Sequence, residues 1–224
     1  MGYNRQRELC QVTTTETQHE KPPAPSFELI AGNLCLDFIN TLDDRFSDHP
    51  KELLTAYSDL VLFLEQSGLL THEDADQLLK QSRLKPSEAE DNLRRAIELR
   101  EAAFAVFSAI IDKRTVPANS LATLNGYIQE AAAQAHLVPA KGAFEWRFDY
   151  RSSLASPRWP IARASAELLA SGHLQFVRAC SSPTCRWFFL DTSKNHRRRW
   201  CDMTKCGNRA KVRKFYARKH STHQ

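Results

Sequence analysis

Residues 180–206 read CSSPTCRWFFLDTSKNHRRRWCDMTKC, and this stretch decides how the end of the chain folds. Its cysteines, Cys180, Cys185, Cys201 and Cys206, form two Cys-x4-Cys pairs that fifteen residues separate. Each pair can bring two thiolates to one ion from a short turn, which is the spacing of a closed structural zinc site. Because four sulfur ligands leave no open position for water, we expect one zinc ion that stabilises the fold and does not catalyse.

The residues between the two cysteine pairs are aromatic and then basic. Residues 187–190 are Trp-Phe-Phe-Leu, and residues 197–200 are Arg-Arg-Arg-Trp. We predict a hairpin in which these two segments are the strands and residues 191–196 form the turn. The aromatic side chains then serve as the small core of a zinc module, with base stacking as the alternative.

The charge of the chain is concentrated at its end. From Arg178 onward there are thirteen Lys or Arg and two acidic residues, a net charge of +11, whereas the preceding residues carry −6. Such asymmetry indicates that the basic end meets a polyanion. We predict a helix over about residues 206–220, with Val212, Phe215 and Tyr216 on one side and basic residues around the rest.

A basic helix anchored by zinc suits a DNA duplex. Lys and Arg neutralise phosphates, and an Arg near the start of the helix would reach guanine edges in the major groove. The alternative is a solvated basic surface that serves solubility. Because a module this small reads few base pairs, a homodimer would extend its site. The predicted contacts with double-stranded DNA are Arg197, Arg198, Arg199, Arg209, Lys211, Arg213, Lys214 and Arg218.

Composition divides the chain into three parts. Residues 1–25 are polar and then rich in proline, and we expect a disordered tail. Residues 26–172 are expected to form a predominantly helical body with one β-hairpin. Residues 173–224 are expected to form the basic zinc module, which consists of a hairpin and a helix. The predicted fold class is therefore α+β.

Apolar periodicity and capping residues locate the elements of the body. Thr71 caps one helix, and Ser87 with Glu90 forms a capping box for the longest one. Alternating apolar and polar residues over 144–150 predict a half-buried strand that pairs with 136–139 and packs on the helices. The predicted helices cover residues 32–42, 58–67, 71–83, 88–114, 120–134 and 161–171.

The first predicted helix carries a polar stripe. Asn33, Asp37 and Asn40 recur at helical spacing, and Arg100 interrupts the apolar seam of the longest helix. We predict that Asp37 and Arg100 pair, or that they hold a small-molecule effector in a pocket with the two asparagines. The alternatives are a stripe that faces water, with Arg100 extended toward solvent, and a buried pair with a purely structural role.

The sequence also argues against several other classes of protein. No apolar stretch approaches the ~18 residues of a membrane span, and no signal-peptide pattern is present, so we expect no membrane contact. Six cysteines, four of them at metal spacing, fit a reducing compartment and predict a cytoplasmic protein. With neither a glycine-rich phosphate loop nor a nucleophile elbow, we expect no enzymatic activity.

The sequence resembles a known pair of domains. Residues 180–214, with RRWCDM at 198–203 and CGNRAKVR at 206–213, resemble the CGNR zinc finger. Residues 32–41, with LDFINT at 36–41, are similar to the opening of the ABATE domain. The resemblance implies zinc on the four cysteines and a stress-induced transcription regulator, in which the finger binds DNA and the N-terminal domain senses a signal.

Two alternatives stay open for the zinc module. It could bind RNA, since a hairpin with Trp and Arg also suits splayed bases. It could instead meet an acidic protein partner through its basic face, in which case it would show no salt-dependent binding to nucleic acid.

Overall fold

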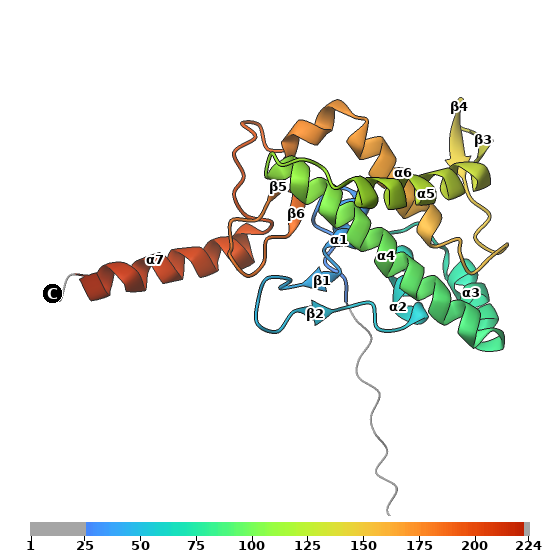
Figure 1. The fold of residues 1–224 in the computed structure, drawn as a ribbon, viewed down its shortest axis with the longest axis horizontal. Helices are drawn as coiled ribbons and strands as arrows, with labels where there is room; N and C mark the ends of the chain where they lie inside the picture. The colour runs from blue at the N-terminus through green and yellow to red at the C-terminus, as the bar shows by residue number, and fades with distance from the viewer. Residues whose placement is uncertain (1–25, 222–224) are drawn as a thin grey trace, which may run out of the picture.

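Helices form most of the structure, with three short antiparallel strand pairs around them (Figure 1). The computed structural model describes residues 26–221, so the predicted disordered tail at 1–25 lies outside the described residues. The elements in chain order are α1 (Leu34–Ile39), β1 (Leu42–Asp43), β2 (Lys51–Glu52), α2 (Tyr57–Gln66), α3 (His72–Leu84), α4 (Pro86–Ile111), α5 (Ala118–Gln134), β3 (His136–Ala140), β4 (Ala143–Arg147), α6 (Arg158–Leu169), the 3-10 helix η1 (Gly172–Phe176), β5 (Val177–Ala179), β6 (Phe188–Leu190), the π-helical turn η2 (Met203–Gly207) and α7 (Asn208–Ser221). This architecture confirms the predicted α+β class.

The 26-residue helix α4 is the centre of the core. Its buried residues recur every three or four positions, as in Leu93, Ala96 and Leu99, because one face of the helix meets α1, α2, α5 and α6. The helix begins with Pro86 at its first position, so the predicted capping box at Ser87 is wrong. A proline has no N–H to satisfy there, and its ring fixes a helical φ.

Two other helices test the capping predictions. Thr71 caps α3 as predicted, because its side-chain oxygen accepts a hydrogen bond from the backbone N–H of Asp74. The predicted first helix is correct in place but too long, since α1 has six residues between its caps Asn33 and Asn40. Cys35, Leu36, Phe38 and Ile39 are buried, which leaves little of α1 for a polar stripe.

The strand pair β3–β4 lies where the sequence predicted it, with Lys141 and Gly142 in the turn. Its burial differs from the prediction, because every residue of β4 is exposed. Only after the strand does the chain return to the core, at Phe148, which packs against Trp159. Alternation alone therefore predicted the strand but not the surface that covers it.

The strand pair of the zinc module corrects a second prediction. β6 pairs with β5, not with residues 197–200, which form no strand. The backbone N–H of Arg198 donates to the carboxylate of Asp191 instead of entering a ladder. The Asp191 side chain also accepts from the N–H and hydroxyl of Ser193, so it organises the loop that replaces the expected hairpin.

The helix α7 and the β3–β4 pair lie at opposite ends of the molecule. In Figure 1, α7 extends away from the other elements at one end, and the β3–β4 pair stands at the other. Within the described residues, no helix combines the length and the apolar character that crossing a membrane requires.

Candidate metal centre and nucleic-acid interface

The four cysteines of the two pairs converge on one point. All four are buried, and their Sγ atoms lie within 4.8 Å of one another. Cys201 Sγ lies 3.6 Å from Cys185 Sγ and 3.7 Å from Cys206 Sγ. Sulfur ligands about 2.3 Å from a tetrahedral zinc ion stand about 3.8 Å apart. The donor set and its spacing therefore fit one structural Zn²⁺, as predicted.

The first cysteine turn follows β5 directly. The backbone N–H of Cys180 donates to the carbonyl of Trp187 at 2.8 Å, so the ladder of β5 and β6 leads into the metal site. Arg186 closes the turn in a left-handed conformation, with φ of 47°, and its N–H donates to the carbonyl of Ser182. The turn can thus bring Cys180 and Cys185 to the same ion.

The second cysteine turn is capped by an acidic side chain. Asp202 Oδ1 accepts hydrogen bonds from the backbone N–H and the hydroxyl of Thr204, at 2.6 and 2.7 Å. The chain then passes through η2 straight into α7, with no intervening loop. Near the start of α7, Arg209 Nη2 lies 3.4 Å from Cys206 Sγ and offsets part of the thiolate charge. The metal site therefore fixes the direction in which α7 leaves.

The body holds β6 by side-chain and backbone bonds. The Asn40 amide donates to the carbonyl of Phe188 and accepts from its N–H, both at 2.9 Å, so it replaces a neighbouring strand. The N–H of Leu190 donates to the carbonyl of Ala31 at 2.8 Å. The rings of Phe104 and Phe188 stack with centroids 5.3 Å apart. The zinc module and the body thus share a buried interface.

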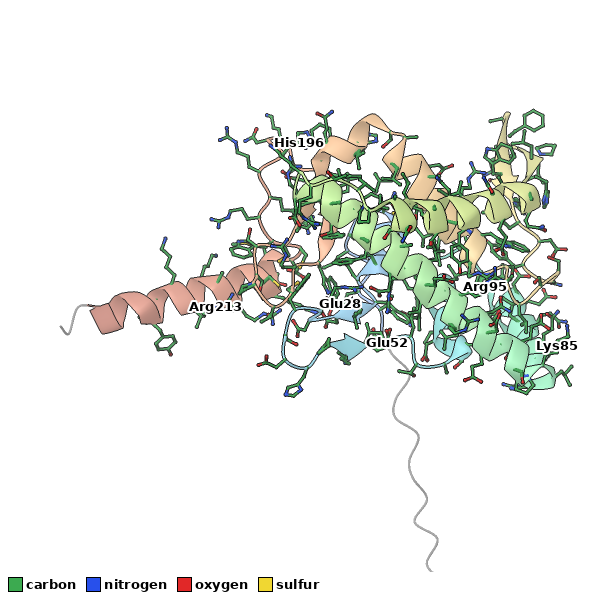
Figure 2. All side chains as sticks on the ribbon, in the orientation of Figure 1. Glu28, Glu52, Lys85, Arg95, His196 and Arg213 are labelled. Carbon is green, nitrogen blue, oxygen red and sulfur yellow. The ribbon has the colours of Figure 1, made fainter. Side chains whose placement is uncertain are left out.

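Most of the predicted DNA contacts lie on the surface. Figure 2 shows the side chain of Arg213 on α7, away from the other elements. The side chain of Arg218 lies outside the described side chains. The exposed members of the predicted set are Arg197, Arg199, Arg209, Lys211, Arg213 and Lys214. Val212, Phe215 and Tyr216, which were expected on one side of this helix, are exposed as well.

Arg198 differs from its neighbours because it supports the fold. Its guanidinium donates to the carbonyls of Trp200 and Cys201 and lies over the ring of Phe189, 4.6 Å from the centroid. A side chain held in this way fixes the approach to the second cysteine pair. Its charge is therefore less available to a phosphate than those of Arg197 and Arg199.

The structure does not bring the four predicted pocket residues together, and the expected pair of Asp37 and Arg100 is wrong. Arg100 is buried and binds Glu52 through two bonds of 2.7 Å, with further bonds to Thr41 and Glu101. Burial disfavours its charge, but Glu52 and Glu101 together more than offset this and raise the pKa of Arg100. Figure 2 shows Glu52 at the β1–β2 pair.

The other three pocket residues also have bonds of their own. Asn33 caps α1, and Asn40 holds β6. Asp37 accepts a bond of 2.8 Å from the N–H of Ala31, the residue whose carbonyl binds Leu190. Burial raises the pKa of Asp37 to about 6, although this backbone bond opposes the rise. The polar stripe therefore joins body to module.

Sequence reasoning missed Glu52 and the role of Asn40. Glu52 lies in a short, mostly polar segment with no periodicity, so nothing marked it as the partner of a buried arginine. The sequence does mark Asn40 as a polar residue on an otherwise apolar helix, and this correctly indicates that its side chain needs a buried partner. Its partner, the backbone of Phe188, is 148 positions away and carries no side-chain signature.

Comparison with known families agrees with these observations. The sequence model of the ABATE family, described as "Putative stress-induced transcription regulator", matches residues 32–172. The model of the CGNR zinc finger matches residues 177–219. No curated protein matches the chain significantly.

Proposed function

The chain belongs to the ABATE family, and on that premise we propose that it is a transcription regulator that binds double-stranded DNA through its zinc finger. The observation that carries this proposal is the isolation of α7. The helix leaves the zinc site as an exposed segment without a single acidic residue, and it contacts little beyond η2 (Figure 1).

The dimensions and charge of α7 suit a major groove. Fourteen residues make a helix about 20 Å long, and a major groove about 12 Å wide admits one helix. Arg209, Lys211, Arg213 and Lys214 are exposed along it. We propose that Arg209, at the start of α7, lies nearest the bases or phosphates while the others neutralise the backbone.

The loop between the cysteine pairs supplies a second basic surface. Arg197 and Arg199 are exposed in the segment that leads to Cys201 and add positive charge to the same module as α7. In contrast, Trp187, Phe188 and Phe189 are buried in the module. Base stacking would require these rings to be accessible, so their burial favours contacts with duplex phosphates over stacking on single strands.

We propose a binding role and not an enzymatic one. A site with four sulfur ligands holds zinc in a closed shell and leaves no position for water or substrate. The ion then acts by fixing the second cysteine turn, from which α7 begins. Binding to DNA would depend on the metal in the same way as the fold of the finger does.

The direct test is binding of the zinc-loaded protein to random duplex DNA at increasing salt. We expect the logarithm of affinity to fall with a slope of about −0.9 for each neutralised phosphate. The double variant Lys211→Ala/Arg213→Ala removes two exposed charges of α7 and should bind more weakly, with a slope shallower by about 1 for each lost contact.

A control must separate local contacts from net charge. Lys80 and Arg83 are exposed on α3, at the end of the molecule away from α7 (Figure 1). The variant Lys80→Ala/Arg83→Ala removes the same charge and should retain the original slope. Equal loss in both double variants, or no binding at low salt, would contradict the proposal. Tighter binding to single-stranded RNA than to duplex DNA would move the function to RNA.

A further inference from the structure

The β3–β4 pair presents an apolar surface that the rest of the described chain covers only in part. Leu137, Phe144 and Trp146 are 54, 69 and 51% exposed. Leu137 lies directly opposite Trp146 in the ladder, so these side chains share one face of the pair. Beside Trp146, a groove of about 270 Å³ between α5 and α6 adjoins the same surface, and its lining combines Ile128 and four alanines with the charged side chains of Arg163 and Glu167. Contiguous apolar surface of this kind marks an interface.

The two edges of this strand pair are not equivalent. Ala140 and Ala143 flank the two-residue turn and so form a hydrogen-bonded pair, and the pair types alternate along the ladder. Pro139 on β3, and Phe144 and Trp146 on β4, therefore direct their backbone groups outward. Pro139 has no N–H to offer, which blocks its edge. The β4 edge has no such block.

The β4 edge also has space beside it. Within the described residues, no hydrogen bond from outside the ladder reaches the backbone of β4. An open groove of about 610 Å³ lies between this strand, α6 and the turn that joins α2 to α3, with Glu145, Trp146 and Arg147 among its lining residues. An unpaired edge next to open space is a template for another strand.

We propose that β4 pairs antiparallel with β4 of a second copy of this chain, about a two-fold axis through Trp146. Glu145 and Arg147 already bond to each other along β4, with Arg147 Nε 2.6 Å from Glu145 Oε1, and the alternation of their opposite charges favours one register between two copies. In this register Glu145 of each copy faces Arg147 of the other, and Trp146 of one copy faces Trp146 of the other. Shifting the axis to Glu145 would set two glutamates against each other. The strand is therefore complementary to itself.

The pairing joins the exposed aromatic faces of two hairpins into one. Outward backbone groups of Phe144 and Trp146 gain partners, and the rings of the two copies lie on the same face of a four-stranded sheet. Such an isologous contact closes after two copies, because the same edge is used on both sides. The inference does not depend on DNA binding, since it concerns the end of the molecule remote from α7 (Figure 1).

Charge reversal tests the proposal. The oligomeric state of the zinc-loaded full chain is measured by analytical ultracentrifugation over a wide range of concentration, without DNA. We expect a dimer. Glu145→Arg or Arg147→Glu alone places like charges opposite each other twice and should weaken dimerisation about tenfold or more. The double variant Glu145→Arg/Arg147→Glu restores opposite charges in every pair and should restore the dimer.

Matched controls keep the test specific. Glu90 is exposed on α4, so Glu90→Arg makes the same charge change away from the strand and should leave the dimer intact. Circular dichroism of each variant establishes that it is folded. A wild-type chain that stays monomeric at all concentrations overturns the inference. So does a dimer that the single reversals do not weaken, or one that the double reversal fails to restore.

Discussion

The strand pairs β3–β4 and β5–β6 are alike in sequence character and opposite in environment. Both are short, antiparallel and rich in aromatic residues. The side chains of Phe188 and Phe189 are buried, because α1, Phe104 and the metal site surround β6. The side chains of Phe144 and Trp146 face solvent. The comparison shows that the aromatic pattern specifies a strand, whereas the burial of that strand depends on what other elements bring to it.

Removing zinc should change the difference in stability between the two strand pairs the most. The binding of structural zinc contributes roughly 10–16 kcal/mol to the folding of isolated fingers. Chelation, or the variant Cys201→Ser, is expected to unfold the module and to abolish hydrogen-exchange protection at β5 and β6. Protection at β3–β4 should be unchanged. Cys10→Ser, outside the ligand set, is the control. Retained protection of β6 without metal would mean that the body alone holds that strand.

Asn40→Ala should have the next largest effect. The change leaves the buried N–H and carbonyl of Phe188 without partners, at a cost of about 2–4 kcal/mol in the free energy of unfolding. Urea unfolding measures this loss. Asn33→Ala removes only a helix cap and should cost about 1 kcal/mol. Equal losses in the two variants would show that Asn40 does no more than end α1.

The variant Asp37→Asn tests how the ionisation of Asp37, beside the segment that holds β6, changes stability with pH. Burial raises the pKa of Asp37 to about 6, so its ionisation opposes folding, and stability should fall as pH rises from about 4 to 6. Asparagine keeps the acceptor for Ala31 but cannot ionise. Above pH 6 the free energy of unfolding of the variant should exceed that of the wild type by on the order of 2–3 kcal/mol. Near pH 4 the two values should be equal. Parallel stability curves over this pH range would contradict the assignment.

Trp146→Ala should have the smallest effect on the folded monomer. The ring is half exposed and the guanidinium of Arg163 lies 4.8 Å from its centroid, so the loss should be about 1 kcal/mol or less. Phe189→Ala in the buried pair should cost about 3–5 kcal/mol. Thermal unfolding at low protein concentration compares the two. Similar losses would mean that β3–β4 is covered in solution.

Local signals in the sequence predicted much of the structure, and distant partners account for the errors. The cap at Thr71, the turn at Lys141-Gly142 and the cysteine spacing each act within a few residues, and each prediction was correct. The strand expected at 197–200 failed because one side chain, Asp191, takes the backbone N–H of Arg198. Competition of this kind leaves no trace in periodicity.

The same distinction applies to the candidate site. The four ligands were identified because metal chemistry fixes their spacing. The predicted pair of Asp37 and Arg100 was wrong because charge complementarity does not specify which acidic residue lies nearest to the arginine. In the structure that residue is Glu52. Likewise, basic composition marked Arg198 as a DNA contact, although its guanidinium is bonded to the backbone next to Cys201.

The bonds between α1 and β6 also set an order of events during synthesis. Asn40 leaves the ribosome 148 residues before Phe188, its partner. At ~5–20 residues per second, roughly 7–30 s pass between the synthesis of Asn40 and that of its partner in β6. During that interval the Asn40 amide lacks its backbone partner, and the Phe104 ring, once it has been made, lacks the stacked ring of Phe188. The surroundings of α1 are therefore completed only when a segment that is synthesised much later packs against it.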